Sequence, residues 1–523
     1  MGKKRSVRPL WLSALLALAA PAAAAPDPAA LYAASCAACH GLDRLGGTGP
    51  ALLPENLGRL KPEQVAAVIR DGRAGTQMPA FGQALAPAEV MALAAYALTP
   101  LPRMPAWGEA EIRASRRQLA DPARLPERPV FAADPLNLFV VVETGDHHIT
   151  VLDGDRFEPI TRFPTRFALH GGPKFSPDGR FVYLMSRDGW VTRYDLWGLT
   201  PVAEVRAGIN SRNIAISDDG RVIAVANYLP HTLVMLDAAT LEPLAVMTVD
   251  DAFHKKTSRV SAVYQAAPRN SFVVALKDLP EIWEISYDPN PPRIFSGLVH
   301  NYEPGMEEGL AQPGPFPFRR VDELKEPLDD FFFDPSYDNL IGSSRDGSKG
   351  VVVNLDVRRV IKELPLLGLP HLGSGITWER QGRQVMATTN LKEPVVSVID
   401  IGTWEVVKRI PVLGPGFFLR GHENSRYVWA DVSMGPEKDK VQVIDRDTLE
   451  VAATLQPAPG KPTGHVEFTR DGRYALLSVS APDGALVVYD AGTLEEVKRL
   501  PMRRPLGKYN VGNKISRSEG TSH

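Results

Sequence analysis

Cysteine is scarce in this sequence: only two of the 523 residues are cysteines, and both lie in one short segment. Positive charge is not in excess either: 59 Lys and Arg residues are balanced by 61 Asp and Glu residues, and no basic tract lies beyond the first ten residues. Nucleic acid is therefore not an expected partner. Beyond the first 25 residues, no apolar run is long enough to cross a bilayer. What is left is an ordinary globular composition, 44% hydrophobic and 23% charged.

The two cysteines belong to a C-x-x-C-H motif formed by Cys36, Cys39 and His40. This is the attachment motif of a c-type haem, in which both thiols bond to the haem and the histidine ligates its iron. The alternative is a disulfide or an unrelated redox pair, but the adjacent histidine favours the haem. Met78, which precedes a proline about 40 residues further on, is the expected second iron ligand. The alternative for Met78 is a core-filling side chain.

Residues 1–25 are predicted to be a signal peptide. A basic start is followed by an apolar segment, Leu10–Ala20, that is too short to span a bilayer, and by small residues suited to cleavage. Removing this segment takes away four positive charges and moves the formal charge from −2 to about −6. Because c-type haem is attached after export, the sequence predicts a soluble periplasmic protein with no membrane span.

The remaining chain divides into a helical part and a β-rich part. Residues 26–102 are predicted to form a small all-α cytochrome c domain, with helices at 28–38, 62–70 and 86–98. Residues 103–130 are Pro-rich and are expected to be a linker that contains a short helix near 107–119. From residue 131 to residue 523, short β-type runs alternate with turns.

These β-type runs repeat along the chain. Turn signals recur near residues 137, 179, 220, 270, 339, 382, 424 and 472, at spacings of 41 to 50 residues except for one of 69. A unit of strand, turn, strand and connector at this period is typical of propeller blades. The eight marks predict an all-β eight-bladed propeller, with an inserted loop at 288–317. The alternative is a β-sandwich array that does not close.

Several segments of the β-rich region resemble the haem d1 propeller of the cytochrome cd1 nitrite reductase family. They are residues 141–147, 167–170, 186–189 and 194–197, together with the tail at 507–514. The resemblance covers the whole chain after the signal peptide. It implies a haem d1-type macrocycle bound non-covalently, with His170 on its iron and Arg187, Arg212 and Tyr228 on its carboxylates. Without the resemblance, each of these is more simply a structural or solvated side chain.

The sequence departs from the nitrite reductases where those enzymes hold nitrite between two histidines. One of the two is retained as His371, whereas Phe333 takes the place of the other and Ser374 replaces a nearby arginine. Because nitrite reduction consumes two protons, the loss argues against nitrite as substrate. The pattern instead resembles the NirN-type members, periplasmic dihydro-haem d1 dehydrogenases that convert a propionate of the macrocycle to an acrylate. That resemblance implies removal of two electrons, through the covalent haem c, and of two protons.

Removing protons requires a base near the propionate, and histidine or tyrosine is suited to this task. The candidates are His371, His422 and His465, with Tyr474 as a weaker one. His170, His371 and His465 precede their turn marks by nine, eleven and seven residues. Extended approaches would therefore place all three on the same face of the ring. The alternative for each of the three candidate bases is a histidine packed inside a blade.

The expected partners are dihydro-haem d1 as substrate, a periplasmic electron acceptor, other haem d1 maturation proteins, and the nitrite reductase that receives the product. Two other functions stay open. The chain could reduce nitrite to NO, or it could be a carrier or electron-transfer protein that only delivers haem d1. The NirF-type propellers of the family lack a c haem, so the covalent haem here favours redox chemistry over carriage.

Overall fold

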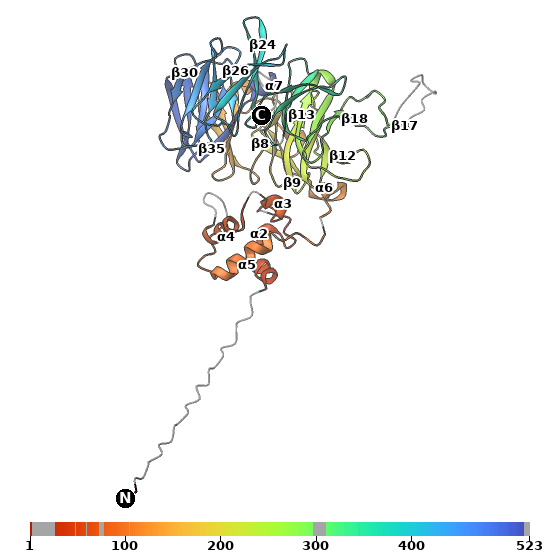
Figure 1. The fold of residues 1–523 in the computed structure, drawn as a ribbon, viewed down its shortest axis with the longest axis vertical. Helices are drawn as coiled ribbons and strands as arrows, with labels where there is room; N and C mark the ends of the chain where they lie inside the picture. The colour runs from red at the N-terminus through yellow and green to blue at the C-terminus, as the bar shows by residue number, and fades with distance from the viewer. Residues whose placement is uncertain are drawn as a thin grey trace.

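A computed structural model of the chain describes residues 1–2, 27–47, 49–58, 60–72, 78–103, 105–296, 310–344 and 346–516. The expected signal peptide lies, apart from residues 1 and 2, outside the described residues, as does part of the inserted loop at 288–317. Two bodies are seen in Figure 1: a small helical domain below and a large β-rich ring above. No helix in the described part of the chain is both long and apolar enough to span a membrane.

The helical body is the expected cytochrome domain, and its helices begin where the sequence supplies start signals. A proline at the first turn opens α1, α4 and α5, and the side chain of Asp27 caps α1 by accepting a hydrogen bond from the backbone N–H of Ala29. Tyr32, Val65 and Leu93 bring the three helices together around one apolar core. The helices are α1 (Pro28–Ser35), α2 (Ala37–His40), α3 (Pro54–Leu57), α4 (Pro62–Asp71) and α5 (Pro87–Ala97).

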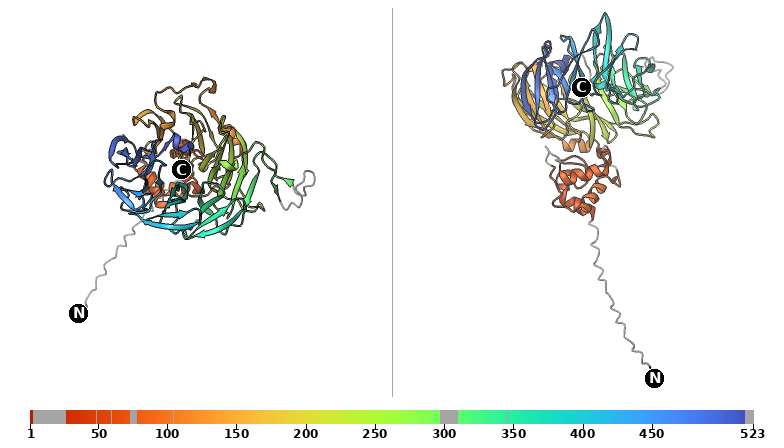
Figure 2. Two further views of the ribbon diagram at one scale, coloured as in Figure 1. Left: turned by 90° about the horizontal axis from the view of Figure 1, so that it is seen from above. Right: turned by 60° about the vertical axis from the view of Figure 1, so that its left-hand side comes forward.

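The β-rich body is an eight-bladed propeller, so the predicted fold is confirmed. Eight antiparallel sheets surround a central axis, which Figure 2 shows in its left-hand view. Neighbouring blades touch through the strand at the inner edge of each sheet, for example β9 with β13 and β31 with β35. Outermost strands are often half-exposed and alternate in burial, as β26 (Glu405–Pro411) does, because only one of their faces meets a neighbouring blade.

Each blade has four core strands, ordered from the axis outwards. The first four blades are β35 (Pro505–Asn510), β2 (Leu138–Glu143), β3 (His148–Asp153) and β4 (Glu158–Pro164); β5 (Lys174–Phe175), β6 (Phe181–Met185), β7 (Trp190–Asp195) and β8 (Thr200–Arg206); β9 (Asn210–Ile216), β10 (Val222–Leu229), β11 (Thr232–Asp237) and β12 (Pro243–Thr248); β13 (Val260–Ala266), β14 (Ser271–Leu276), β15 (Ile282–Ser286) and β18 (Phe318–Val321).

The other four blades are β19 (Leu328–Phe333), β20 (Asn339–Ser344), β21 (Gly350–Asn354) and β22 (Arg359–Leu364); β23 (Ile376–Arg380), β24 (Arg383–Thr389), β25 (Val395–Asp400) and β26 (Glu405–Pro411); β27 (Leu419–Arg420), β28 (Tyr427–Asp431), β29 (Val441–Asp445) and β30 (Val451–Leu455); β31 (Thr463–Phe468), β32 (Tyr474–Val479), β33 (Gly484–Asp490) and β34 (Glu496–Met502). A separate hairpin, β16 (Phe295–Ser296) with β17 (Leu310–Ala311), lies in the inserted loop.

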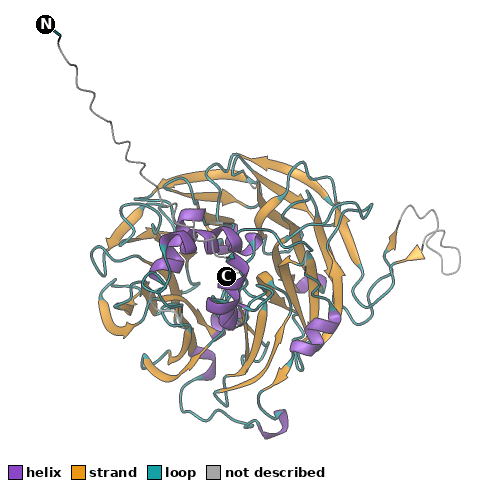
Figure 3. Ribbon diagram, turned by 90° about the horizontal axis from the view of Figure 1, so that it is seen from below, coloured by secondary structure: helices purple, strands orange, loops and turns teal. Residues whose placement is uncertain are grey.

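The ring is closed by strands from the two ends of the propeller sequence. β35 pairs with β2, and Tyr509 lies opposite Val140 in the register. The chain then continues into α7 (Val511–Ser516), which contacts β2, β5 and β35. In Figure 3, which views the ring from below, helices are seen at its centre. The residues of α7 therefore lie near the propeller axis.

The segment expected to be a linker is more structured than the sequence indicated. Its short helix, α6 (Glu109–Ser115), buries Ile112 completely against the propeller. The next residues form β1 (Arg117–Gln118), which pairs with β8 as a fifth strand of that blade. Part of the 103–130 segment thus belongs to the propeller, although its composition is Pro-rich.

Candidate haem sites

The C-x-x-C-H motif lies in a cavity of about 660 Å³ whose walls include Cys36, Cys39, His40 and Met78. His40 is 7% exposed, and its Nδ1 lies 2.7 Å from the carbonyl oxygen of Pro50. Donation from Nδ1 to that carbonyl fixes the tautomer and leaves Nε2 as the metal-binding atom. Burial lowers the pKa of His40, which keeps the imidazole neutral. These features fit a covalently attached haem with the expected His and Met ligands.

One wall of this haem c cavity is supplied by the propeller. Residues 146–148 and 164–167, together with Asp188 and Arg503, line it opposite the helical domain. A haem in the cavity would therefore lie at the boundary between the two bodies. The expected electron acceptor of the chain thus faces the propeller directly.

His170, the expected proximal ligand of the second haem, shows the same arrangement of its ring nitrogens. Its Nδ1 lies 2.7 Å from the backbone carbonyl oxygen of Arg212, which leaves Nε2 for an iron atom. Both arginines expected to bind carboxylates lie beside Nε2: Arg187 Nη2 is 3.1 Å away and Arg212 Nη1 is 3.0 Å away. The structure thus brings three of the predicted residues into one cluster. Two cations at this place suit a macrocycle with several carboxylates.

Tyr228, the fourth residue of the predicted haem d1 set, lies on β10 and is 9% exposed. The cationic groups of Arg259 and Lys277 lie over its ring, 5.5 Å and 5.4 Å from the ring centre. Tyr228 also lies close enough to Arg212 to interact with it electrostatically. It therefore borders the same positively charged region as His170.

His371 lies on another side of the axis, in the loop that precedes β23. Its Nδ1 is 2.6 Å from the carbonyl oxygen of Phe417 and 3.0 Å from Oγ of Ser374. Its ring packs edge-on against Phe417 and Phe418, at centre-to-centre distances of 5.6 Å and 5.9 Å. Burial lowers the pKa of His371, and the nearby Asp330 opposes part of that shift. The imidazole is therefore neutral, and its Nε2 can accept a proton.

His465 contacts the Phe418 ring that His371 also contacts. Its ring centre is 4.6 Å from that of Phe418 and 5.1 Å from that of Tyr509. His465 occupies a bulge of β31 with a left-handed φ of 52°, which turns its side chain out of the regular strand alternation. Its Nδ1 is 3.5 Å from both the backbone nitrogen and Nζ of Lys508. Burial and the neighbouring lysines lower its pKa well below the usual value.

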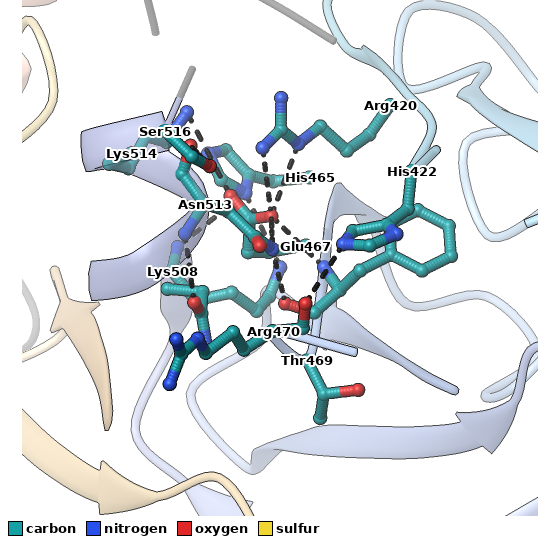
Figure 4. Close-up of polar contacts among 12 residues, drawn as sticks. Arg420, His422, His465, Glu467, Thr469, Arg470, Lys508, Asn513, Lys514 and Ser516 are labelled. Atoms are coloured by element: carbon teal, nitrogen blue, oxygen red, sulfur yellow. Dashed lines mark hydrogen bonds and ion pairs between the residues drawn. The ribbon is translucent and has the colours of Figure 1, made fainter. Parts of the chain in front are cut away.

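A buried network of charges lies behind His465, and Figure 4 shows it centred on Glu467. The carboxylate of Glu467 pairs with Arg420 at 3.1 Å and with Lys514 of α7 at 3.8 Å. Burial alone would raise the pKa of Glu467, but these two cations hold it below its ordinary value. Burial lowers the pKa of Lys514 to about 7 and that of the fully buried Lys508 well below its ordinary value. Lys508 and a fraction of Lys514 are therefore neutral near physiological pH.

Of the two other candidate bases, His422 lies beside the Glu467 network in Figure 4, whereas Tyr474 lies in an apolar core. His422 is completely buried, and both of its ring nitrogens contact backbone groups, Arg470 O at 3.2 Å and Asn424 N at 3.1 Å. Tyr474 packs edge-on against Phe157 in the core between two blades. Their surroundings are those of structural side chains, whereas His371 and His465 both contact the ring of Phe418 near the axis.

Phe333, which the resemblance places where the nitrite reductases have a second histidine, is a core side chain in this structure. Phe333 is 1% exposed and packs between two blades with Phe331 and Tyr337. The same strand, β19, brings Asp330 towards the axis instead. Asp330 accepts hydrogen bonds from the Tyr264 hydroxyl at 2.8 Å and from the backbone N–H of Gly373 at 3.0 Å. Phe331 and Phe333 share one face of β19 and one apolar core, whereas Phe332 lies on the opposite face.

Sequence reasoning missed four buried polar residues of the axis region: Asp330, Asp431, Glu467 and Lys508. The carboxylate of Asp431 accepts hydrogen bonds from the backbone N–H groups of Phe417, at 2.8 Å, and Phe418, at 3.2 Å. It therefore holds the aromatic pair between the two histidines. The available signal was the presence of a charged residue in a strand that is otherwise apolar, which is unusual unless the charge is paired.

Comparisons with known proteins identify two families that match this chain. The family described as cytochrome D1 heme domain matches residues 133–297 and 316–514, and the family described as cytochrome C oxidase, cbb3-type, subunit III matches residues 23–96. Dihydro-heme d1 dehydrogenase of Pseudomonas aeruginosa is 56% identical over 514 residues, which are 98% of this chain and 99% of that protein.

One further relative and one solved structure are also similar to this chain. Protein NirF of Pseudomonas aeruginosa is 30% identical over 71% of this chain and 90% of its own length. The solved structure of dihydro-heme d1 dehydrogenase NirN in complex with DHE is 56% identical, with a TM-score of 0.86 over 94% of this chain and 100% of that chain.

Proposed function

The chain belongs to the cytochrome d1 haem domain family, and we propose that it oxidises dihydro-haem d1 to haem d1 in the periplasm. The reaction removes two electrons and two protons from one propionate side chain of the macrocycle, leaving an acrylate. The product is haem d1, so this is the last step of its biosynthesis. The electrons pass on to an external periplasmic one-electron acceptor.

The macrocycle is bound at the cluster around His170. In this proposal Nε2 of His170 ligates the iron of the substrate, which requires Arg187 and Arg212 to move off that nitrogen. The carboxylates of the macrocycle provide new partners for both guanidinium groups, with charge-assisted hydrogen bonds in place of those to imidazole. Tyr228 borders the same region and contributes a further hydrogen-bonding group. Binding of the iron and binding of the carboxylates are therefore coupled.

The residues that hold haem c are Cys36 and Cys39 by covalent bonds, and His40 and Met78 as ligands of the iron. When bound, haem c accepts electrons one at a time. The contribution of the chain is to place that acceptor against the propeller and to keep His40 neutral with Nε2 available. Oxidation of one macrocycle thus needs two successive electron transfers to the external acceptor.

The two protons go to the side chains that face the axis. His465 is the base in this proposal, because burial and nearby positive charges keep its ring neutral. The backbone N–H of Lys508 donates a hydrogen bond to Nδ1 of His465 at 3.5 Å, and the buried amine of Lys508, whose pKa is well below the usual value, lies beside the same nitrogen as a further proton acceptor. His371, whose Nδ1 is held by Phe417, presents Nε2 from the other side of the aromatic pair and takes the second proton.

A single observation carries the proposal. One chain combines a C-x-x-C-H cavity that is open to the propeller with two neutral histidines that flank one aromatic pair at the propeller axis. An electron acceptor and proton acceptors are therefore present together, as a dehydrogenation requires. A carrier would need neither. In place of a second histidine for nitrite, the axis holds the buried carboxyl group of Asp330, which is unfavourable for an anion.

Three parallel anaerobic assays of the haem c-loaded protein test the proposal. With dihydro-haem d1, we expect oxidation of the macrocycle and reduction of haem c. With haem d1 and nitrite under reducing conditions, we expect no sustained formation of NO. Tight binding of dihydro-haem d1 without any oxidation would instead establish a carrier, and sustained NO production would establish a nitrite reductase.

A further inference from the structure

Arg206 is a buried arginine that connects the cytochrome domain to the propeller. It is the last residue of β8, is 6% exposed, and its guanidinium group bridges two backbone carbonyls. Nε donates to the carbonyl oxygen of Asp188 at 2.8 Å, in the propeller, and Nη2 donates to that of Leu45 at 2.6 Å, in the cytochrome domain. One side chain therefore bonds to both bodies.

On the cytochrome side, Arg206 reaches the loop that follows the haem motif. Leu45 lies five residues after His40, and the next residue, Gly46, donates its backbone N–H to the carbonyl oxygen of His40 at 2.9 Å. Apolar contacts of Ala51 and Leu53 with the propeller surround this loop. The position of the His40 backbone is thus tied to the position of Leu45.

On the propeller side, Arg206 reaches the turn that carries the haem d1 ligand set. Asp188 lines the haem c cavity, and its neighbour Arg187 places Nη2 3.1 Å from Nε2 of His170. The backbone N–H of Arg187 also donates to the carbonyl oxygen of Ala168, at 3.0 Å, two residues before His170. Adjacent residues of one tight turn therefore face the two haem sites.

Two residues of the linker, Trp107 and Ser115, contact Arg206. The indole of Trp107 lies under the guanidinium group, 4.8 Å from ring centre to Cζ, and its Nε1 donates to the carbonyl oxygen of Arg206 at 2.9 Å. The hydroxyl of Ser115 accepts a hydrogen bond from the backbone N–H of Arg206 at 2.9 Å. The positive charge is balanced by the nearby Asp188 and Asp43. A flat, bidentate donor stacked on an indole is a role that lysine fills poorly.

We propose that Arg206 is the positioning residue that fixes the cytochrome domain on the propeller in the arrangement through which electrons leave the macrocycle for haem c. The bonded route runs from Arg187 at His170, through the carbonyl of Asp188 and the guanidinium group, to Leu45 beside His40. Each electron that leaves the macrocycle reduces the ferric iron of haem c to ferrous iron. This inference rests on the proposed dehydrogenase activity, because that activity supplies the electrons.

The test compares Arg206→Gln with Arg193→Gln in the haem c-loaded, full-length protein. Arg193 is a matched control: it lies on β7 of the same blade, is 8% exposed, stacks on Phe181 at 3.7 Å and bonds to a backbone carbonyl, that of Ala239. It belongs to the propeller and its bond does not reach the cytochrome domain. Arg206→Lys is the second variant, which retains the charge and most of the volume.

Two readouts are required. Hydrogen exchange of the segment 41–57, followed by mass spectrometry, reports how often the domain leaves its docked position. We expect Arg206→Gln to speed this exchange by about tenfold or more for each lost hydrogen bond to the charged group. Anaerobic rapid mixing of dihydro-haem d1 with the oxidised protein reports the rate of haem c reduction, which should fall by about tenfold or more while the haem c spectrum is unchanged. Arg206→Lys should give intermediate values, and Arg193→Gln wild-type values.

The inference is overturned if Arg206→Gln matches the wild type in either readout, or if Arg193→Gln changes both readouts equally. If the wild-type protein itself does not reduce haem c with dihydro-haem d1, the proposed function fails. The exchange comparison then still decides whether Arg206 fixes the docked arrangement, so the two failures are distinguishable.

Discussion

Replacing His465 and His422 separately by asparagine should separate chemistry from stability. His465 faces the axis between Phe418 and Tyr509, whereas both ring nitrogens of His422 contact backbone groups inside the protein. Loss of a general base slows a reaction by about 10²–10⁴-fold, which corresponds to about 3–5 kcal/mol of activation free energy. Asparagine tolerates the left-handed φ of 52° at position 465, so the backbone is retained.

The opposite pattern is expected for His422→Asn. Losing its contacts leaves a buried backbone donor or acceptor unsatisfied, which lowers the free energy of unfolding by about 1–3 kcal/mol. The rate of oxidation of dihydro-haem d1 by the folded fraction should stay close to that of the wild type. Denaturant titration and single-turnover kinetics of both variants measure the two quantities. If His422→Asn abolishes the reaction and His465→Asn does not, the assignment of the base is refuted.

Three further predictions follow from the same geometry. His170→Ala should weaken binding of haem d1 by at least about 100-fold and leave the haem c spectrum unchanged; unaltered affinity in an anaerobic titration would remove the proximal ligand assignment. Arg420→Ala leaves Glu467, which is 1% exposed, without its closest cation, so it should cost about 3–5 kcal/mol of unfolding free energy. Arg359→Ala removes an ion pair with Glu323 in which the side chains are 68% and 57% exposed, so it should cost only about 0.2–1 kcal/mol, and equal losses would contradict the burial argument. Because the pKa of Lys514 is about 7, nearby substrate carboxylates should raise it, so binding should take up protons and weaken as the pH rises above about 7, which calorimetry in buffers of different ionisation enthalpy detects.

The sequence was sufficient for the architecture because local signals and the global fold agree. Prolines open α4 and α5, and the turns recur at nearly constant spacing along the propeller. Each blade is one antiparallel sheet whose strands are adjacent in the chain, apart from β1, β18 and β35. A repeat of this kind is visible in the sequence because every blade buries its two faces against neighbouring blades in the same way. The boundary of the linker was harder to place, since the pairing of β1 with β8 joins residues about 85 positions apart.

The candidate site was only partly accessible from the sequence. The motif at Cys36 and the resemblance around His170 pointed to the two haem regions. The period-two argument grouped His170, His371 and His465 on one face, but a bulge and a left-handed φ at position 465 override the strand alternation there. The burial of Phe333 between two blades was not apparent from three consecutive phenylalanines, because adjacent residues of a strand point to opposite faces. The contact of Arg206 with Leu45 joins distant residues through backbone carbonyls, which leave no trace in side-chain patterns.

The central claim is that the chain removes two hydrogen atoms from the substrate and passes the electrons through haem c. The most direct measurement is an anaerobic reaction of the haem c-loaded protein with dihydro-haem d1 and an excess of a one-electron acceptor. The extracted tetrapyrrole is weighed by mass spectrometry and the reduced acceptor is counted. The account predicts a macrocycle that is lighter by two hydrogen atoms and two reduced acceptor molecules for each macrocycle converted. An unchanged tetrapyrrole mass, with haem c still oxidised, would contradict it.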